Sequence, residues 1–330
     1  MNHDRGPWMN KTSTLCYDYD LSQFEIGGNE LILYITLVLG ILISLWILLG
    51  NTLVIATYRA NRSLHTVGNF YIAQLAIADF LTGMVGLFVI ISNTFFPLKW
   101  VCSVTYIFIY QFFAIVSLAS SLGFLIMISV NRYIAVFCSL RYHSIMSQHK
   151  SIIISITVWS LSVIYSMIIM TDFYVYISAY KEEMNVEVEC EKSVEIPRIT
   201  GYSIGIIFLI VLLVHGAIYT MIFKAVRKLQ RKAKHSTRDC PNVPVSGANL
   251  KLIKTALIII CLFTICWAPF AVSLTIAQYG WLSRVDVNIL FYPAYVLAIV
   301  NSGMNPVIYG IRSVSYRAGM SKLLRLKIIR

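Results

Sequence analysis

The sequence predicts an all-α membrane protein, a bundle of seven transmembrane helices followed by a short amphipathic eighth helix. Three observations support this fold class: seven long apolar segments, charged residues sorted between alternate loops, and a basic amphipathic stretch after the last segment. A helix needs roughly 20 apolar residues to cross the hydrocarbon of a bilayer. Because 58% of the 330 residues are hydrophobic and only 13% are charged, we expect one membrane domain and no separate soluble domain.

The seven apolar segments carry almost no charge. Six of them contain no Asp, Glu, Lys or Arg, and the second contains Asp79 alone. In chain order, the predicted helices are Leu31–Tyr58, Val67–Leu98, Trp100–Asn131, Ser151–Thr171, Ile199–Phe223, Thr255–Ser283 and Val287–Ile311. We therefore divide the chain into an N-terminal segment (1–30), a seven-helix domain (31–311), and an amphipathic helix with a short tail (312–330).

The eighth helix is predicted over residues 313–329. Apolar side chains recur there at helical spacing with basic residues between them, namely Val314, Tyr316, Met320, Leu323 and Leu324. A helix with one apolar face and one basic face is typical of a segment that lies on the membrane surface.

Charges alternate between the loops. With the N-terminus outside, the inner loops and tail hold 19 of the 27 Lys and Arg residues, and the outer segments hold 13 of the 15 Asp and Glu residues. Cytoplasmic loops are enriched in Lys and Arg, so we expect a multi-pass plasma-membrane protein with an extracellular N-terminus and a cytoplasmic C-terminus. The net charge of +12 would suggest nucleic acid in a soluble chain. Here the basic residues adjoin the membrane, so we expect anionic lipid as the partner and no nucleic acid.

The outer side offers a glycosylation site and a disulfide. Residues 1–30 lack the basic start and apolar core of a cleavable signal peptide, so we expect a short extracellular segment. Asn10 begins an Asn-Lys-Thr sequon within it. Cys16, Cys102 and Cys190 face the oxidising side. A bridge from Cys102 to Cys190 is the preferred one of three pairings that remain open.

Polar residues and prolines inside the spans form an ordered set of motifs. They are Gly50-Asn51, LAIAD at Leu75–Asp79, Asn131-Arg132-Tyr133, Trp159, Tyr219, CWAP at Cys266–Pro269 and NPVIY at Asn305–Tyr309. In this order they resemble the rhodopsin-like G-protein-coupled receptors across roughly residues 31–325, and the run 132–147 is particularly similar to melanocortin and amine receptors. The resemblance implies a receptor, not an enzyme, that binds an extracellular ligand and activates a heterotrimeric G protein by conformational change.

Asp79 is the first functional candidate, because an ionisable residue at mid-membrane costs at least about 2.5–3.5 kcal/mol on insertion scales. The resemblance implies that it lines a hydrated pocket for an allosteric sodium ion together with Ser121, Asn301, Ser302 and Asn305. Hard oxygen ligands suit such a cation. The alternative is a protonated Asp79 that is satisfied by Asn51 and water. No other cofactor is expected.

A second set of residues is expected to couple ligand binding to the G protein. The resemblance implies that Arg132 and two tyrosines form the surface that receives the G-protein C-terminus, while an aromatic residue repacks as the sixth helix swings outward. Pro269 and Pro306 interrupt their helices, which predicts kinks and freed carbonyls that neighbouring groups must satisfy. The residues assigned to coupling and activation are Arg132, Tyr133, Tyr219, Phe263, Asn305, Pro306 and Tyr309.

Two departures from the family pattern lie beside Arg132. Asn131 replaces the usual acidic neighbour, and Asn249 stands where many amine receptors carry a glutamate. Both carboxylates that would hold the arginine in a resting ion pair are therefore missing. We expect raised basal signalling, although partly solvated pairs contribute little energy.

The expected ligand pocket is apolar and aromatic, as small-molecule sites generally are. It comprises Phe113, Ala114, Leu118, Ser203, Ile207, Trp267, Phe270 and Tyr295, and core packing is an equally good interpretation of Leu118 and Ile207. Ala114 occupies the position where amine receptors carry an aspartate, so an ordinary monoamine is not the expected ligand. Cys102 lies 30 residues before Arg132, farther than in most relatives. Because 30 residues span about 45 Å of helix, the usual disulfide geometry is in question.

Other classes of function fit less well. No His, Ser or acidic residues have the spacing of a metal site or a catalytic triad. Lysine is absent between Lys254 and Lys322, which argues against a retinal Schiff base in the seventh helix. A seven-helix transporter or channel would account for Asp79 but predicts inverted repeats or broken helices, and neither is found. A decoy receptor that binds without coupling remains an alternative.

Overall fold

The computed structural model describes residues 30–96, 100, 103–138, 141–184, 198–235, 258–259, 261–273, 276 and 284–325. The labelled elements are α1 (Glu30–Ala60), η1 (Arg62–Leu64), α2 (Val67–Phe95), α4 (Val104–Phe137), α5 (Tyr142–Ile145), α6 (Gln148–Met184), α7 (Arg198–His235), α9 (Arg284–Arg312) and α10 (Val314–Leu323). Asn10, Cys102, Cys190 and Asn249 lie outside the described residues, so the predictions for them stay predictions.

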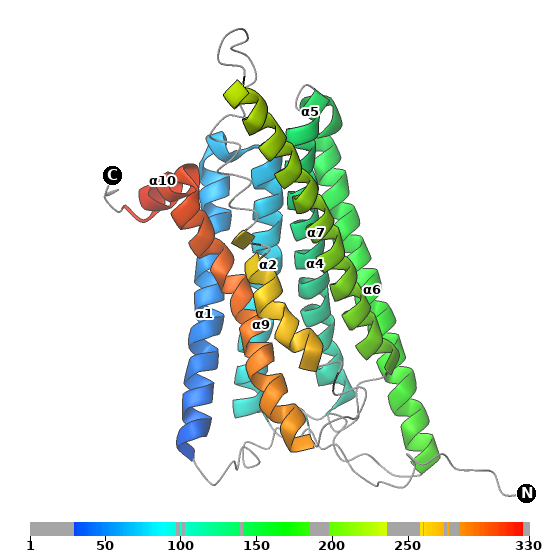
Figure 1. Ribbon diagram of the computed structural model, residues 1–330. Coiled ribbons are helices and arrows are strands. Elements are labelled where there is room, and N and C mark those ends of the chain that lie inside the picture. The colour runs from blue at the N-terminus through cyan, green and yellow to red at the C-terminus, as the bar shows by residue number, and fades with distance from the viewer. Residues whose placement is uncertain are drawn as a thin grey trace, which may run out of the picture.

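The predicted bundle of apolar helices is confirmed. Six helices of the described part are long and apolar enough to cross a membrane, and Cys261–Ser273 forms a shorter apolar helix between α7 and α9. These seven helices follow the seven predicted spans in order. They lie side by side, with α10 turned across one end of the bundle (Figure 1). Below, this is called the Arg132 end, since Arg132 lies near the last turns of α4.

Several predicted boundaries were wrong. The third span starts at Val104 and not at Trp100. Ser103 caps this helix, because its hydroxyl accepts a hydrogen bond from the Tyr106 N–H at 3.3 Å. The fourth span continues past Thr171 to Met184. Its extension, DFYVYISAYKEEM, stays largely apolar as far as Ala179 and ends with Lys and Glu, which are good helix formers. Hydropathy marks where the hydrocarbon ends, but a helix continues for as long as its residues favour it.

Two close approaches bring α1 against α9. A Cβ atom at Gly50 would lie 3.0 Å from the Pro306 ring, and one at Gly303 would lie 2.8 Å from the Trp46 ring. Since α1 packs on α2, α9 and α10, each glycine lets a ring of the other span pack directly against its backbone. The Gly50-Asn51 motif thereby places Asn51 beside α9.

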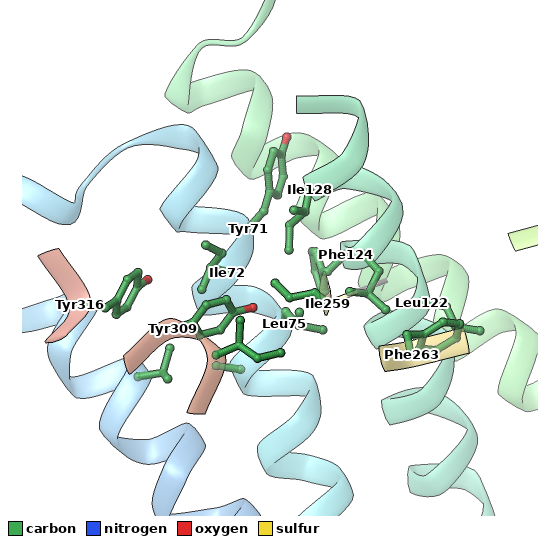
Figure 2. Close-up of a cluster of buried hydrophobic side chains, with 14 of the residues drawn as sticks. Tyr71, Ile72, Leu75, Leu122, Phe124, Ile128, Ile259, Phe263, Tyr309 and Tyr316 are labelled. Carbon is green, nitrogen blue, oxygen red and sulfur yellow. The ribbon is translucent and has the colours of Figure 1, made fainter. Parts of the chain in front are cut away.

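A hydrophobic cluster fills the half of the bundle toward the Arg132 end. Figure 2 shows side chains from α2, α4, α9 and α10 converging, with Tyr309 and Tyr316 neighbouring each other and Phe263 on the far side. On α6, the Trp159 indole donates a hydrogen bond to the Gln74 side-chain oxygen of α2 at 3.0 Å. A smaller cluster at the opposite end contains Tyr106, Ile107, Phe173 and Ile177.

The eighth helix forms, but it is shorter than predicted and uses its apolar residues differently. It ends at Leu323, where the prediction continued to residue 329. Tyr316 and Met320 are buried against the bundle and not in a membrane surface, whereas Val314, Leu323 and Leu324 are exposed. The close contact explains this: a Cβ at Gly319 would lie 2.6 Å from Thr57 of α1. One face of α10 thus packs on protein.

Candidate functional site

Asp79 is fully buried and hydrogen-bonded from two other helices. The Ser121 hydroxyl of α4 donates to its Oδ1 at 3.3 Å, and the Asn305 amide of α9 donates to its Oδ2 at 2.7 Å. Ser302 lies near the same carboxyl group. Asn301 is buried as well, but within the described part of the chain no hydrogen bond joins it to Asp79. The structure therefore gathers Asp79, Ser121, Ser302 and Asn305 of the five predicted residues.

Asn51 does not bind Asp79, so that part of the alternative prediction was wrong. Its amide donates to the carbonyls of Ile47 at 2.9 Å and Ser302 at 3.1 Å. Pro306 has no N–H group, which leaves the carbonyl four residues earlier, on Ser302, without its helical partner. Asn51 supplies that missing donor. The expectation that a neighbouring group satisfies a freed carbonyl is confirmed at this position.

Residues of α1 and α9 that pack in this region carry buried polar atoms without partners. Among the described residues, Asn51 Oδ1, Asn305 Oδ1 and the Tyr309 hydroxyl are buried and have no hydrogen-bond partner. Such groups cost about 1–3 kcal/mol when unsatisfied, and they usually mark water or an ion. With the Asp79 carboxylate and the Ser121 hydroxyl, they are oxygens of the hard kind that a sodium ion takes as ligands.

Arg132 lies near the end of α4 without a carboxylate partner among the described residues. Its side chain is half-buried, and the buried Nε has no hydrogen-bond partner. Tyr142, Tyr219 and Tyr309 interact electrostatically with the guanidinium group. The predicted grouping of Arg132 with the tyrosines of α7 and α9 is therefore present in the structure. Tyr133 does not join it, because its ring stacks on Phe137 at 4.5 Å.

Tyr142 is a member of this site that sequence reasoning missed. Its hydroxyl donates to Asn131 Oδ1 at 2.9 Å, from the short helix α5 to α4. Burial raises the pKa of the Tyr142 phenol above 10.0, partly offset by Arg132 and by the bond to Asn131. The phenol therefore stays protonated and acts as a donor. The only signal in the sequence was the position of Tyr142 in the run 132–147, which is similar to melanocortin and amine receptors.

Aromatic rings connect the middle of the bundle to the opposite end. The ring centroids of Phe263 and Trp267 are 6.0 Å apart, those of Trp267 and Phe270 are 5.8 Å apart, and those of Phe270 and Tyr295 are 5.8 Å apart. Phe263 also packs on Phe208 of α7 at 5.9 Å. Three predicted pocket residues thus form one continuous row above Phe263.

The other predicted pocket residues are more dispersed. Leu118 and Ile207 pack against the main hydrophobic cluster, which agrees with the core-packing interpretation. The Ser203 hydroxyl pairs with Tyr165 of α6 at 3.0 Å. Phe113 is exposed and its ring meets Phe112 edge-on at 5.3 Å, and the Ala114 side chain is partly exposed.

The arrangement defines a multi-pass membrane receptor fold. The sequence profile of the family described as 7 transmembrane receptor (rhodopsin family) matches residues 50–309, and the chain belongs to this family. A family of receptors agrees with the expectation that the chain is not an enzyme.

Relatives within the family have diverse names. The chain is 26% identical to "Rhodopsin, GQ-coupled" of Mizuhopecten yessoensis, covering 87% of this chain and 58% of that protein. It is 26% identical to melanopsin of Mus musculus, covering 86% and 55% respectively. With lysophosphatidic acid receptor 1-A of Xenopus laevis it shares 27% identity, covering 87% and 74%. The chain thus spans little more than half the length of the first two relatives.

Proposed function

We propose that this chain is a receptor that binds an extracellular ligand and activates a heterotrimeric G protein by conformational change. The observation that carries the proposal is the site around Arg132. A half-buried guanidinium, held by no carboxylate of the described residues, lies among phenols of α7 and α9 at one end of a seven-helix bundle. Arg132 is partly exposed there, and a guanidinium group has five N–H donors that can pair with a protein segment.

A continuous series of contacts supports transmission between the two ends. The aromatic row from Tyr295 to Phe263 leads into the main hydrophobic cluster, which contains Tyr219 and Tyr309 beside Arg132. A ligand that binds the active arrangement more tightly than the resting one shifts the population toward it by that difference in affinity. No finding favours the transporter or decoy alternatives.

The proposed orientation places the Arg132 end in the cytoplasm of a cell and the N-terminus outside, in the plasma membrane. The support is the distribution of charge: Arg59, Arg62, Arg312, Arg317 and Lys322 lie on α1, η1, α9 and α10 at that end. Anionic lipid headgroups attract such residues by about 1 kcal/mol each. We further propose the Asn10 glycan and the Cys102–Cys190 bridge on the outer side.

The proposed ligand is neither a monoamine nor retinal. Ala114 offers no carboxylate to an ammonium group, and α9 contains no lysine, although relatives are named rhodopsin and melanopsin. The row of Trp267, Phe270 and Tyr295 favours an apolar or aromatic small molecule. The finer likeness to melanocortin and amine receptors is proposed only for the run 132–147.

The proposed allosteric ion is sodium at Asp79. Ser121, Ser302 and Asn305 would hold it with the carboxylate, with Asn301 as the remaining member of the predicted set. Bound there, the cation would neutralise a charge that the apolar interior otherwise disfavours. It would stabilise whichever arrangement of α2, α4 and α9 keeps these oxygens together.

The test is G-protein dissociation in cells that express the intact chain without added ligand. We expect measurable basal dissociation that Arg132→Ala abolishes at equal surface expression. Asn131→Asp restores a carboxylate beside the arginine and should lower basal output, by up to about five-fold if the pair is worth 0.2–1 kcal/mol. Unchanged output in Asn131→Asp would refute the raised basal activity, and equal output in Arg132→Ala would refute coupling through this site.

A further inference from the structure

Gly68 is buried in the first turn of α2, beside the end of α4 that carries Arg132. Its backbone is helical, with no left-handed φ angle that would call for a glycine. Glycine is also the least favourable helix residue apart from proline, because it has the most backbone freedom to lose. A glycine at such a position indicates that another part of the molecule approaches the backbone closely.

The close approach comes from two polar side chains of α4. A Cβ atom on Gly68 would lie 3.0 Å from Asn131 Nδ2, 3.2 Å from Arg132 Nη2 and 3.4 Å from Arg132 Nη1. Non-bonded heavy atoms are normally about 3.5–4.0 Å apart, so even a methyl group would displace these nitrogens. The space that a side chain at position 68 would take is therefore filled by the Asn131 amide and the Arg132 guanidinium group.

Charge does not account for this position of the guanidinium group. Among the described residues, no carboxylate pairs with Arg132, and its buried Nε has no hydrogen-bond partner. The first turn of α2 carries the positive end of the helix dipole, which disfavours a cation beside it. The interactions that remain are with the phenols of Tyr142, Tyr219 and Tyr309. The guanidinium group therefore lies against α2 because it fits the space at Gly68, and not because an opposite charge holds it there.

This position limits what Arg132 can bind. Both terminal nitrogens lie next to the Gly68 backbone, so α2 covers part of the donor surface of the guanidinium group. A protein segment that pairs with the group from the Arg132 end needs these N–H donors. The group must therefore leave the space at Gly68 to pair fully. A change that favours one of the two positions shifts the population between them.

We propose that Gly68 is a positioning residue for Arg132. Because it has no side chain, it provides the space that keeps the guanidinium group against α2, and it thereby favours the resting arrangement. The contact replaces by shape the restraint that a carboxylate at position 131 would supply by charge. The effect on signalling rests on the proposed function, whereas the position of the guanidinium group does not.

Two substitutions at this one position should act in opposite directions. Gly68→Leu fills the space with an apolar side chain and displaces the guanidinium group. Gly68→Asp has a side chain of similar size but places a carboxylate beside the arginine, and an acidic residue is also favoured in the first turn of a helix. A general loss of packing would change both variants in the same direction, so opposite signs distinguish positioning from a merely structural role.

The first measurement is the reactivity of Arg132 toward phenylglyoxal, an arginine reagent, followed by peptide mass spectrometry of the purified full chain. Gly68→Leu should raise the rate at Arg132 by at least about five-fold, the lower limit for overpacking. Gly68→Asp should lower it by up to about five-fold, as an ion pair would. The rate at the exposed Arg59 should stay constant. Equal rates at Arg132 in wild type and Gly68→Leu would overturn the proposal.

Controls separate the local effect from loosening of the bundle. Gly216→Leu makes the same change where a Cβ has nothing within 4 Å, and it should leave the rate at Arg132 unchanged. An equal rise in Gly216→Leu would overturn the assignment to Gly68. Gly68→Ala requires only a small shift and should give a smaller rise than Gly68→Leu. If Gly68→Leu does not fold, Gly68→Ala and Gly68→Asp carry the test, and equal rates in these two would overturn the proposal.

One carboxylate outside the described residues needs its own control. On the side of the membrane predicted for this site, the sequence offers Asp239. Asp239→Asn should leave the phenylglyoxal reactivity of Arg132 unchanged. A rise as large as that of Gly68→Leu would show that Asp239 holds the arginine, and it would overturn the proposal.

The second measurement is basal G-protein dissociation in cells at equal surface expression. Gly68→Leu should raise it and Gly68→Asp should lower it, each by about two- to five-fold, and the two should not differ when combined with Arg132→Gln. Changed reactivity with unchanged dissociation would refute the role of Gly68 in the resting arrangement. Absence of dissociation in every variant counts against the proposed coupling, while the reactivity of Arg132 still decides whether Gly68 positions it.

Discussion

The contact between Asn51 and the carbonyl of Ser302 gives the sharpest test of how this bundle is held together. Asn51→Ala removes the donor that replaces the N–H group missing at Pro306. The Ile47 carbonyl, the other acceptor of the Asn51 amide, still has its helical partner. The loss is therefore one buried carbonyl left unsatisfied, worth about 1–3 kcal/mol, plus the packing lost with the side chain.

A double-mutant cycle isolates the carbonyl from the packing. Pro306→Ala restores a backbone N–H that can donate to Ser302, so Asn51→Ala should cost less in that background by about 1–2 kcal/mol. Packing losses at position 51 are common to both backgrounds and cancel. The assay is the free energy of unfolding, or the melting temperature, of the four purified proteins. Equal costs of Asn51→Ala in the two backgrounds would refute the assignment of Asn51 to the freed carbonyl.

Three further predictions concern the packing and the polar contacts. Gly303→Ala would place its Cβ 2.8 Å from the Trp46 indole of α1 and should destabilise the protein by about 1–3 kcal/mol. The control Gly216→Ala has nothing within 4 Å of the new Cβ and should be neutral or stabilise by up to about 1 kcal/mol. Equal shifts of the melting temperature in the two variants would contradict this reasoning. Tyr316→Phe removes a buried hydroxyl without a partner in the described structure and should stabilise by about 1 kcal/mol. Because burial raises the pKa of Tyr316 above 10.0, folded wild type holds this proton more tightly and loses stability as pH rises above that value, a loss that Tyr316→Phe should reduce. Tyr142→Phe removes the donor to Asn131 and should cost about 0.5–1.5 kcal/mol, with little further loss when combined with Asn131→Ala; additive losses would show that the two side chains are not coupled.

Hydropathy predicted the helices well because the bilayer imposes a minimum length and excludes charge, and both constraints are visible in a single sequence. It predicted the helix ends poorly. The predicted fourth span stopped before the acidic residue Asp172, but the apolar part of α6 continues to Ala179 and good helix formers carry the helix to Met184. The apolar spacing of α10 likewise indicated an amphipathic helix but not which surface covers Tyr316, because this depends on its approach to α1 at Gly319.

The candidate sites were predictable only where a motif fixes a residue inside a helix. Asp79 and Asn305 lie on motifs, and their hydrogen bond follows from the order of the helices. Tyr142 lies beyond a loop that includes residues 139–140, outside the described part, so its contact with Asn131 depends on a path that periodicity does not describe. The predicted partner of Asn51 was also wrong. Pro306 leaves the Ser302 carbonyl without its helical N–H partner, and the donor that replaces it comes from α1 and not from the same helix.

Tyr309 joins the two polar regions of the bundle. Its buried ring interacts electrostatically with both Asp79 and Arg132, and it packs on Tyr316 at 5.7 Å. Asp79 accepts from two donors and lies among buried polar groups, whereas Arg132 lies among phenol hydroxyls, which can accept from its guanidinium group. Two sites that share a side chain can be coupled in free energy, and any such coupling is reciprocal. If an ion at Asp79 changes the position of Tyr309, it changes the affinity of the Arg132 site for its protein partner, and binding of that partner changes the affinity at Asp79 by the same factor. The absence of a carboxylate at position 131 therefore affects both the Arg132 region and the Asp79 region, which Tyr309 connects.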